Sequence, residues 1–254
     1  MAGRPGPHLH IGGDTILHRM PAPAKIVGLV LFAFAVVSVP APGFVPLAAA
    51  LVVAALLVAV TRAPLRTIGG RLVIEVPFLV FAALMPFVAT GPRVQLGPIE
   101  VSEPGLQAAW QLAAKATAAV LAATAFSVTT THRDVVAGLQ WLRLPATLVA
   151  ILSFMLRYLT VVGDEMARMR VARESRGFRS RSPRGWRVLA ASLGALFIRS
   201  YERGDRVHVA MLSRGWSGHL PDLGIGRVAT RFWGQAAVPA LLVAAASVAT
   251  LVTR

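Results

Sequence analysis

Two short stretches of this chain repeat each other: Val171-Ala172-Arg173-Glu174-Ser175-Arg176-Gly177-Phe178 and Val209-Ala210-Met211-Leu212-Ser213-Arg214-Gly215-Trp216. They are offset by 38 residues and share a Val-Ala pair, followed by Ser-Arg-Gly and an aromatic residue. Upstream of each, an acidic residue is followed four positions later by an Arg, at Asp164 and Arg168 and at Glu202 and Arg206. Agreement in register over this length indicates one recognition element that is used twice.

Each repeat has the features of a helix end exposed for recognition. A Gly can adopt the left-handed conformation that ends many helices, and an Arg just before it suits the negative end of the helix dipole. The guanidinium carries its donors in a fixed fork, and an aromatic side chain can be buried in a groove of a partner. The predicted docking residues are Ala172, Ser175, Arg176, Gly177 and Phe178 in the first repeat and Ala210, Ser213, Arg214, Gly215 and Trp216 in the second.

A simpler interpretation is that Arg-Gly only ends two cytoplasmic helices near anionic lipid. That interpretation would suffice for a single copy of the motif. Two copies in register favour the docking of a partner protein.

The composition is that of an integral membrane protein. The chain has 254 residues, of which 56% are hydrophobic, and a mean hydropathy of +0.65, which lies above the range of soluble domains. A net charge of +15 would suggest nucleic acid for a soluble chain, but in a membrane protein basic residues mark the segments that stay in the cytoplasm. The segment from Gly163 to Arg231 holds fourteen Arg and six acidic residues. We therefore predict that it is cytoplasmic, and we expect no nucleic-acid partner.

The apolar runs predict an all-α membrane protein with about five transmembrane helices and two long amphipathic cytoplasmic helices. Between Lys25 and Arg62 lie 36 uncharged residues interrupted by the turn 40–43, enough for a tight hairpin of two spans. Further spans are predicted at 72–90, 106–128 and 232–252, with a weakly acidic loop after the first of these. The predicted regions are a cytoplasmic tail (1–24), a four-helix transmembrane region (25–128), a cytoplasmic region with the two amphipathic helices (129–231) and a final transmembrane helix (232–254).

Two other apolar runs, 146–156 and 188–198, are only eleven residues long. Runs of ten to fourteen residues are typical of buried or interfacial helices and not of spans. With a cytoplasmic N-terminus, four spans return the chain to the cytoplasm. The Arg-rich segment is then cytoplasmic only if no further span lies between the fourth span and the final one. The faces expected to pack are formed by Val149, Leu152, Leu156, Leu159, Val162, Met166 and Met169 in the first helix and by Leu189, Leu193, Leu196, Ser200, Gly204, Val207 and Met211 in the second.

Two ionisable residues, Glu75 and Lys115, are predicted to lie within the membrane. Such groups are functional candidates by default. Lys115 shares a helix face with Gln107 and Gln111, so this face is expected to contact protein and not lipid. A backbone carbonyl partner or snorkelling would also account for the lysine, and Glu75, near the other end of its helix, is expected to be too far away to pair with it.

The sequence gives little support to catalysis. Lys occurs only at positions 25 and 115, so there is no phosphate-binding Lys on a Gly-rich loop, and no H-E-x-x-H motif is present. There is no Cys, and His8 and His10 lack a third metal ligand, so a flexible tail is the simpler interpretation of that segment. We predict no catalytic residue, no cofactor and no metal site in this chain.

The paired motifs resemble the two Ala-Arg-Gly signatures in the coupling helices of the transmembrane T component of energy-coupling factor (ECF) transporters. Flanking stretches resemble the cobalt-type, CbiQ-like subfamily over roughly residues 14–220. The family often has Asp-Pro-Arg where this chain has Ala22-Pro23-Ala24, and Tyr is common at the position of Trp216. The stretches that carry the likeness are Leu17–Lys25, Thr130–Pro145, Leu156–Glu165 and Ala210–Gly218.

This resemblance implies a multi-pass protein of the bacterial cell membrane that couples ATP hydrolysis to uptake. Two cytoplasmic ABC-type ATPase subunits would receive Arg176 and Arg214, and a separate membrane subunit would bind the substrate. Cobalt is the expected substrate, with nickel or a vitamin as alternatives. Two hypotheses from other classes remain open: an intramembrane lipid-modifying enzyme that uses Glu75 and Lys115, and a scaffold that binds anionic lipid through its bulk charge.

Overall fold

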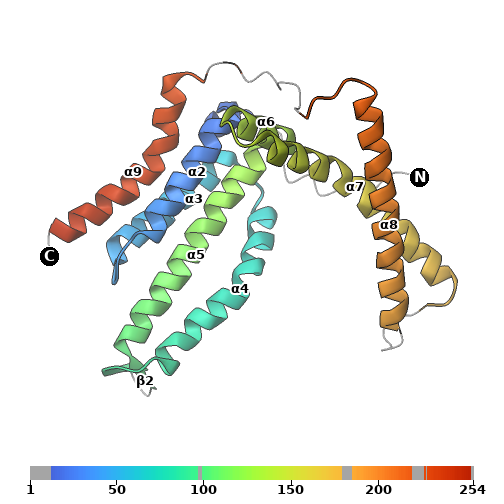
Figure 1. The fold of residues 1–254 in the computed structure, drawn as a ribbon. Helices are drawn as coiled ribbons and strands as arrows, with labels where there is room; N and C mark the ends of the chain where they lie inside the picture. Colours follow the sequence, from blue (N-terminus) through green and yellow to red (C-terminus); the bar gives the residue numbers. More distant parts are fainter. Residues whose placement is uncertain (1–12, 97–98, 179–184, 219–225, 227, 253–254) are drawn as a thin grey trace. The chain divides into compact units, whose positions relative to one another are not determined.

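The computed structural model describes residues 13–96, 99–178, 185–218, 226 and 228–252, and Figure 1 shows the course of the chain. The His8/His10 tail lies outside the described residues. The helices divide into two compact units. We call residues 7–141 and 224–254 the bundle unit and residues 142–223 the pair unit.

The first two membrane helices form the predicted tight hairpin. After the short helix α1 (Ile16–Arg19), α2 (Ala22–Val37) and α3 (Phe44–Thr61) are joined by the Pro- and Gly-containing turn. Gly43 in this turn has a positive φ of 41°, a conformation that Gly adopts without steric cost. At 16 residues, α2 is shorter than the other membrane helices of the bundle unit.

The third and fourth membrane helices, α4 (Leu65–Val88) and α5 (Glu103–Thr129), pack side by side. The helix α4 begins earlier than the predicted Leu72, because the basic residues before that position continue the helix instead of ending it. The interior prolines Pro77 and Pro86 lie within α4 as predicted.

The segment expected to be a loop after α4 contains a small antiparallel hairpin, which the sequence analysis missed. It is formed by β1 (Arg93–Leu96) and β2 (Ile99–Ser102). Both strands alternate apolar and polar residues, a pattern typical of strands, but four residues each are too few for that signal to stand out. At the end of β2, Ser102 caps α5 by accepting a hydrogen bond from the Gly105 N–H at 3.4 Å.

Small residues allow close approach of the helices in the bundle core. In α5, Ala114, Ala118 and Ala122 are buried against a core that includes Leu47 and Ala50 of α3. Small side chains are the usual means by which membrane helices approach each other closely. The bundle is therefore held mainly by shape complementarity along α5.

The last helix, α9 (Thr230–Val252), runs parallel to α2. A Cβ atom on Gly28 of α2 would lie 2.9 Å from the Ala236 carbonyl oxygen near the start of α9. Further along, Val243 joins the same core as Phe32 and Val36. At the start of α9, Trp233 packs against Trp141, the last residue of the short helix α6 (His132–Trp141), with ring centroids 5.6 Å apart.

This parallel packing limits how often the intervening chain crosses the membrane. Helices α3, α4 and α5 bring the chain back to the end of the bundle at which α2 begins, and α9 starts from that same end (Figure 1). The segment between α5 and α9 must therefore make an even number of crossings. The predicted absence of a span between residues 145 and 229 meets this condition, as two spans would, and it stays a prediction.

The pair unit consists of α7 (Ala146–Ser175) and α8 (Gly185–Leu212). Five helices of the described chain are long and apolar enough to cross a membrane: α3, α4, α5, α7 and α9. The predicted number of five is thus reproduced with a different set, since α7 qualifies and the shorter α2 does not. With α2 counted as a crossing, an even number between α5 and α9 requires that α7 and α8 both span or that neither does, and the absence of a span in the pair unit stays a prediction.

The predicted packing faces of the pair unit are partly wrong. Leu159 and Leu193, which were expected to pack, are 63% and 53% exposed. The groove between the helices is instead lined by Ile151, Phe154, Met155, Tyr158, Val161, Val162 and Glu165 of α7 and by Leu196, Arg199, Ser200, Arg203 and Gly204 of α8. The helical period was therefore correct, but α7 turns a different apolar face to its neighbour, and the Glu165–Arg199 ion pair lies at the end of that face.

Reporter fusions test the topology. Fusions after Arg93, Thr131 and Arg254 should report the outside, the cytoplasm and the outside, because basic residues cluster at the end of the bundle where α2 and α9 begin. A cytoplasmic signal from the fusion after Arg254 would contradict this topology and would make α7 a membrane span.

The contact between α4 and α5 gives a prediction about stability. In Gly105→Ala, the new Cβ would lie 2.7 Å from the Met85 carbonyl oxygen, so the helices must separate and the melting temperature of the purified chain should fall. Gly69→Ala in α4 is the matched control, because a Cβ added there would meet no atom within 4 Å. That control should gain up to about 1 kcal/mol of helix stability; equal melting temperatures for the two variants would contradict the close contact.

Candidate partner-docking site

The first repeat forms a regular helix end on α7. The Phe178 N–H donates to the Arg173 carbonyl at 3.1 Å, and the Gly177 N–H donates to the Glu174 carbonyl at 3.0 Å. Gly177 has a φ of +75°. These features define a Schellman motif, in which a left-handed Gly reverses the chain and satisfies the last carbonyls of the helix.

The second repeat forms the same motif at the end of α8. The Trp216 N–H donates to the Met211 carbonyl at 3.0 Å, the Gly215 N–H donates to the Leu212 carbonyl at 2.9 Å, and Gly215 has a φ of +78°. The repeated sequence thus encodes a repeated backbone, in which each Arg comes directly before the left-handed residue.

The small residues of the motifs have matching roles as well. The Ser175 hydroxyl donates to the Ala172 carbonyl at 3.0 Å, and the Ser213 hydroxyl donates to the Ala210 carbonyl at the same distance. Each Ser therefore bonds to its own helix, while Arg176 and Arg214 remain exposed. The structure presents two guanidinium groups on two equivalent turns.

The aromatic residues of the two copies differ in their surroundings. Phe178 is half-buried, and Trp216 is half-buried with its ring edge-on to His208, at a centroid distance of 5.8 Å. The indole N–H of Trp216 is buried and has no hydrogen-bond partner among the described residues. The second copy thus has a larger aromatic side chain at its tip, with a ring contact of its own.

A basic groove adjoins the first copy. Arg168, Arg173 and Arg176 of α7 line it together with Arg199 and Ser192 of α8. The second copy has Met211 at the position that corresponds to Arg173. Positive charge is therefore concentrated around the tip of α7.

Glu165 joins the two helices of the pair unit, a role that the sequence analysis missed. Its carboxylate accepts hydrogen bonds from Arg168 on the same helix at 2.6 Å and from Arg199 on α8 at 2.7 Å, and its side chain is only 17% exposed. The predicted pair between Asp164 and Arg168 is wrong, because Arg168 turns to this neighbouring carboxylate instead. The predicted pairs Arg170–Glu174 and Glu202–Arg206 are present at 2.8 and 3.9 Å.

Comparison with known proteins identifies the family. The chain matches the CbiQ family of cobalt transport proteins over residues 13–223. The chain belongs to this family. Its resemblance to cobalt-type T components is thereby confirmed, and it is a multi-pass transmembrane component of a transporter.

Three named relatives agree with this assignment. The cobalt transport protein CbiQ of Rhodobacter capsulatus is 29% identical over 212 residues, which cover 80% of this chain and 81% of the relative. The energy-coupling factor transporter transmembrane protein EcfT of Bacillus selenitireducens is 25% identical over 241 residues, covering 89% and 87%. The nickel permease LarQ of Lactiplantibacillus plantarum is 29% identical over 96 residues, covering 37% and 34%.

In this CbiQ-family chain, Lys115 is held by the end of α2. Its amine donates to the carbonyls of Val37 and Val39, both at 3.0 Å. The expected carbonyl partner is therefore confirmed. The lysine satisfies backbone oxygens that a helix end leaves free.

Glu75 lies elsewhere than predicted. Because α4 begins at Leu65, Glu75 is near the middle of this helix, where it is 2% exposed and accepts a hydrogen bond from the Thr117 hydroxyl at 2.6 Å. Thr117 is only two residues from Lys115 on α5, but residues two apart do not share a helix face. The Lys115 side chain thus faces α2, while Thr117, the partner of Glu75, faces α4. Glu75 and Lys115 are therefore separated because they lie on different sides of α5, and not because they lie at different heights along the helices.

The left-handed turns give a prediction about the two motif ends. Gly177→Ala and Gly215→Ala place a Cβ in a left-handed conformation, at a cost of roughly 1 to 2 kcal/mol. Amide hydrogen exchange at residues 177–178 or 215–216 should therefore become faster in the corresponding variant. The control Gly194→Ala, at an open position within α8, should leave both turns protected; equal exchange in all three variants would contradict the role of the Schellman turns.

Proposed function

We propose that this chain is the energy-coupling membrane subunit of an ECF-type uptake transporter, in which Arg176 and Arg214 each dock one of two cytoplasmic ABC-type ATPase subunits. The observation that carries the proposal is the pair of equivalent helix ends, each with an exposed Arg before a left-handed Gly. Two equivalent helix ends suit two equivalent binding sites, one on each ATPase subunit.

Docking by an exposed Arg suits a carboxylate in a groove of each ATPase subunit. A guanidinium pairs with a carboxylate through two parallel hydrogen bonds, and such a pair is directional. The Schellman turn fixes the direction in which the Arg leaves the helix. Phe178 and Trp216 would provide the apolar part of each contact.

The pair unit is suited to transmit a movement of the ATPase subunits. Arg199 of α8 reaches Glu165 on α7, so a displacement of either helix end acts on the other helix through this contact. Leu196 is buried, but most side chains of the two helices are exposed. A pair with few buried contacts can change its geometry at low cost in packing energy.

A face of α8 suits contact with a substrate-binding membrane subunit. Trp186, Phe197 and Tyr201 are between 72% and 74% exposed, and their spacing places them with Leu193 on one side of the helix. Large exposed apolar faces mark interaction sites. Tilting of the bound membrane subunit by the moving helices would then carry the substrate inward.

In this proposal the chain is not an enzyme, and ATP hydrolysis takes place in the partner ATPase subunits. The proposed substrate is cobalt, which the name of the Rhodobacter capsulatus relative supports. Nickel is an alternative supported by the name of the LarQ relative, and a vitamin is another. An intramembrane lipid-modifying enzyme has less support, because Glu75 and Lys115 lie toward different helices.

Charge reversal tests the docking role of the motifs. In Arg176→Glu and in Arg214→Glu, an attractive pair becomes repulsive at a desolvated contact; truncation alone of one partner in such a pair costs about 2 to 5 kcal/mol. Either variant should lose substrate uptake almost completely, and the double variant should no longer co-purify with the ATPase subunits.

The matched controls are Arg187→Glu and Arg231→Glu, which make the same charge change at exposed positions of the Arg-rich segment outside the motifs. Both should retain uptake and co-purification. Equal, small losses in all four single variants would show that the segment acts through bulk positive charge and would contradict docking at the two motifs.

A further inference from the structure

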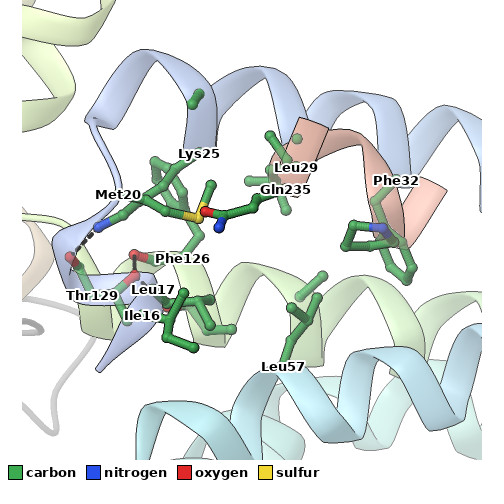
Figure 2. A pocket seen from close by; sticks show the side chains of 16 residues that line it. Ile16, Leu17, Met20, Lys25, Leu29, Phe32, Leu57, Phe126, Thr129 and Gln235 are labelled. Atoms are coloured by element: carbon green, nitrogen blue, oxygen red, sulfur yellow. Dashed lines mark hydrogen bonds between the residues drawn. The ribbon is translucent and has the colours of Figure 1, made fainter. Parts of the chain in front are cut away.

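An apolar cavity lies inside the bundle unit at the end where α2 and α9 begin. Figure 2 shows its lining, with Leu17 and Met20 from the region of α1, Phe32 from α2 and Phe126 from α5. Most of the lining side chains are aliphatic or aromatic. The docking motifs are in the pair unit and take no part in this cavity.

One end of the cavity is polar. The Lys25 amine lies there and donates to the Thr129 carbonyl at 2.7 Å, as the dashed line in Figure 2 shows. The lysine is only 9% exposed. An ammonium group has three N–H donors, and the Thr129 carbonyl uses one of them.

The cavity therefore combines a buried cation with a long apolar wall. A buried ammonium group is costly unless its donors are satisfied. A ligand that pairs with Lys25 at one end and fills the apolar space beyond it would satisfy both parts. Such a ligand has an anionic head and a hydrocarbon tail.

We infer that this cavity binds one acyl chain of an anionic phospholipid, whose phosphate lies at Lys25. The surrounding bilayer supplies this ligand, and the end of the bundle with the lysine is also the end with Arg62, Arg66 and Arg71, which basic-residue topology places toward the cytoplasmic leaflet. Anionic lipids in that leaflet attract basic groups near the membrane surface. This inference does not depend on the docking of ATPase subunits.

The shape of the site favours a phospholipid over a soluble anion. Inorganic phosphate would pair with Lys25 but leave the apolar wall around Leu29 and Phe32 uncovered. An acyl chain from the surrounding bilayer is already in a hydrocarbon environment, so its transfer into the cavity gains little hydrophobic free energy. The apolar wall therefore accommodates the tail, while the contact with the amine selects the head group.

Native mass spectrometry of the full chain tests the inference, with equimolar dioleoyl phosphatidylglycerol and dioleoyl phosphatidylcholine as probes. The wild type should retain phosphatidylglycerol preferentially. Lys25→Met should reduce this preference by about fivefold or more, since one lysine near a membrane surface contributes about 1 kcal/mol to the binding of anionic lipid. Leu17→Trp, which fills the cavity from the small helix α1, should reduce the binding of both lipids at this site.

Lys115→Met is the matched control, because it removes the other lysine, which bonds to backbone carbonyls away from the cavity. It should leave the preference unchanged. Retained binding of phosphatidylcholine by Lys25→Met distinguishes loss of the head-group preference from loss of the fold.

Three results would overturn the inference. The first is an equal loss of preference in Lys115→Met or in Arg231→Gln, which would indicate bulk charge. The second is unchanged lipid binding in Leu17→Trp, which would place the lipid elsewhere. The third is displacement of phosphatidylglycerol by sodium oleate or by inorganic phosphate at equal concentration, which would assign the site to a fatty acid or a soluble anion.

Discussion

The close approach of α2 and α9 is the contact on which the arrangement of this protein depends. Gly28 leaves room for the Ala236 backbone, and a larger residue there would push the two helices apart. Because these helices run in the same direction, the chain between α5 and α9 must begin and end on one side of the membrane. A van der Waals contact inside the bundle thereby requires the segment that carries both Arg motifs to start and finish on the same side of the membrane.

Backbone carbonyls accept hydrogen bonds from three basic side chains of the bundle unit. Lys25 bonds to Thr129, Lys115 bonds to Val37 and Val39, and Arg71 bonds to the Thr124 carbonyl and the Ser127 hydroxyl. Ends and bends of membrane helices offer carbonyls without a partner, and in hydrocarbon such groups are costly. Lys25 and Lys115 therefore stabilise the ends of neighbouring helices through their carbonyls.

Much of the fold was predictable from the sequence, because apolar runs and prolines report directly on membrane helices. The hairpin of α2 and α3 and the interior prolines of α4 follow from such local signals. The partners of Glu165 and Glu75 did not follow, since they depend on which face a helix turns to its neighbour. The repeat itself predicted two equivalent helix ends, because a Gly with positive φ after an Arg is a local feature that needs no tertiary contact.

The two helix ends share a backbone but differ in chemistry. Around Arg176 lie three further arginines, whereas Arg214 is accompanied by Met211 and by the Trp216–His208 contact. Contacts between charges weaken as ionic strength rises, while apolar contacts do not. Under the proposed docking, the tip of α7 would be the salt-sensitive attachment and the tip of α8 the salt-resistant one, so a structurally symmetrical pair of contacts would come apart in a defined order.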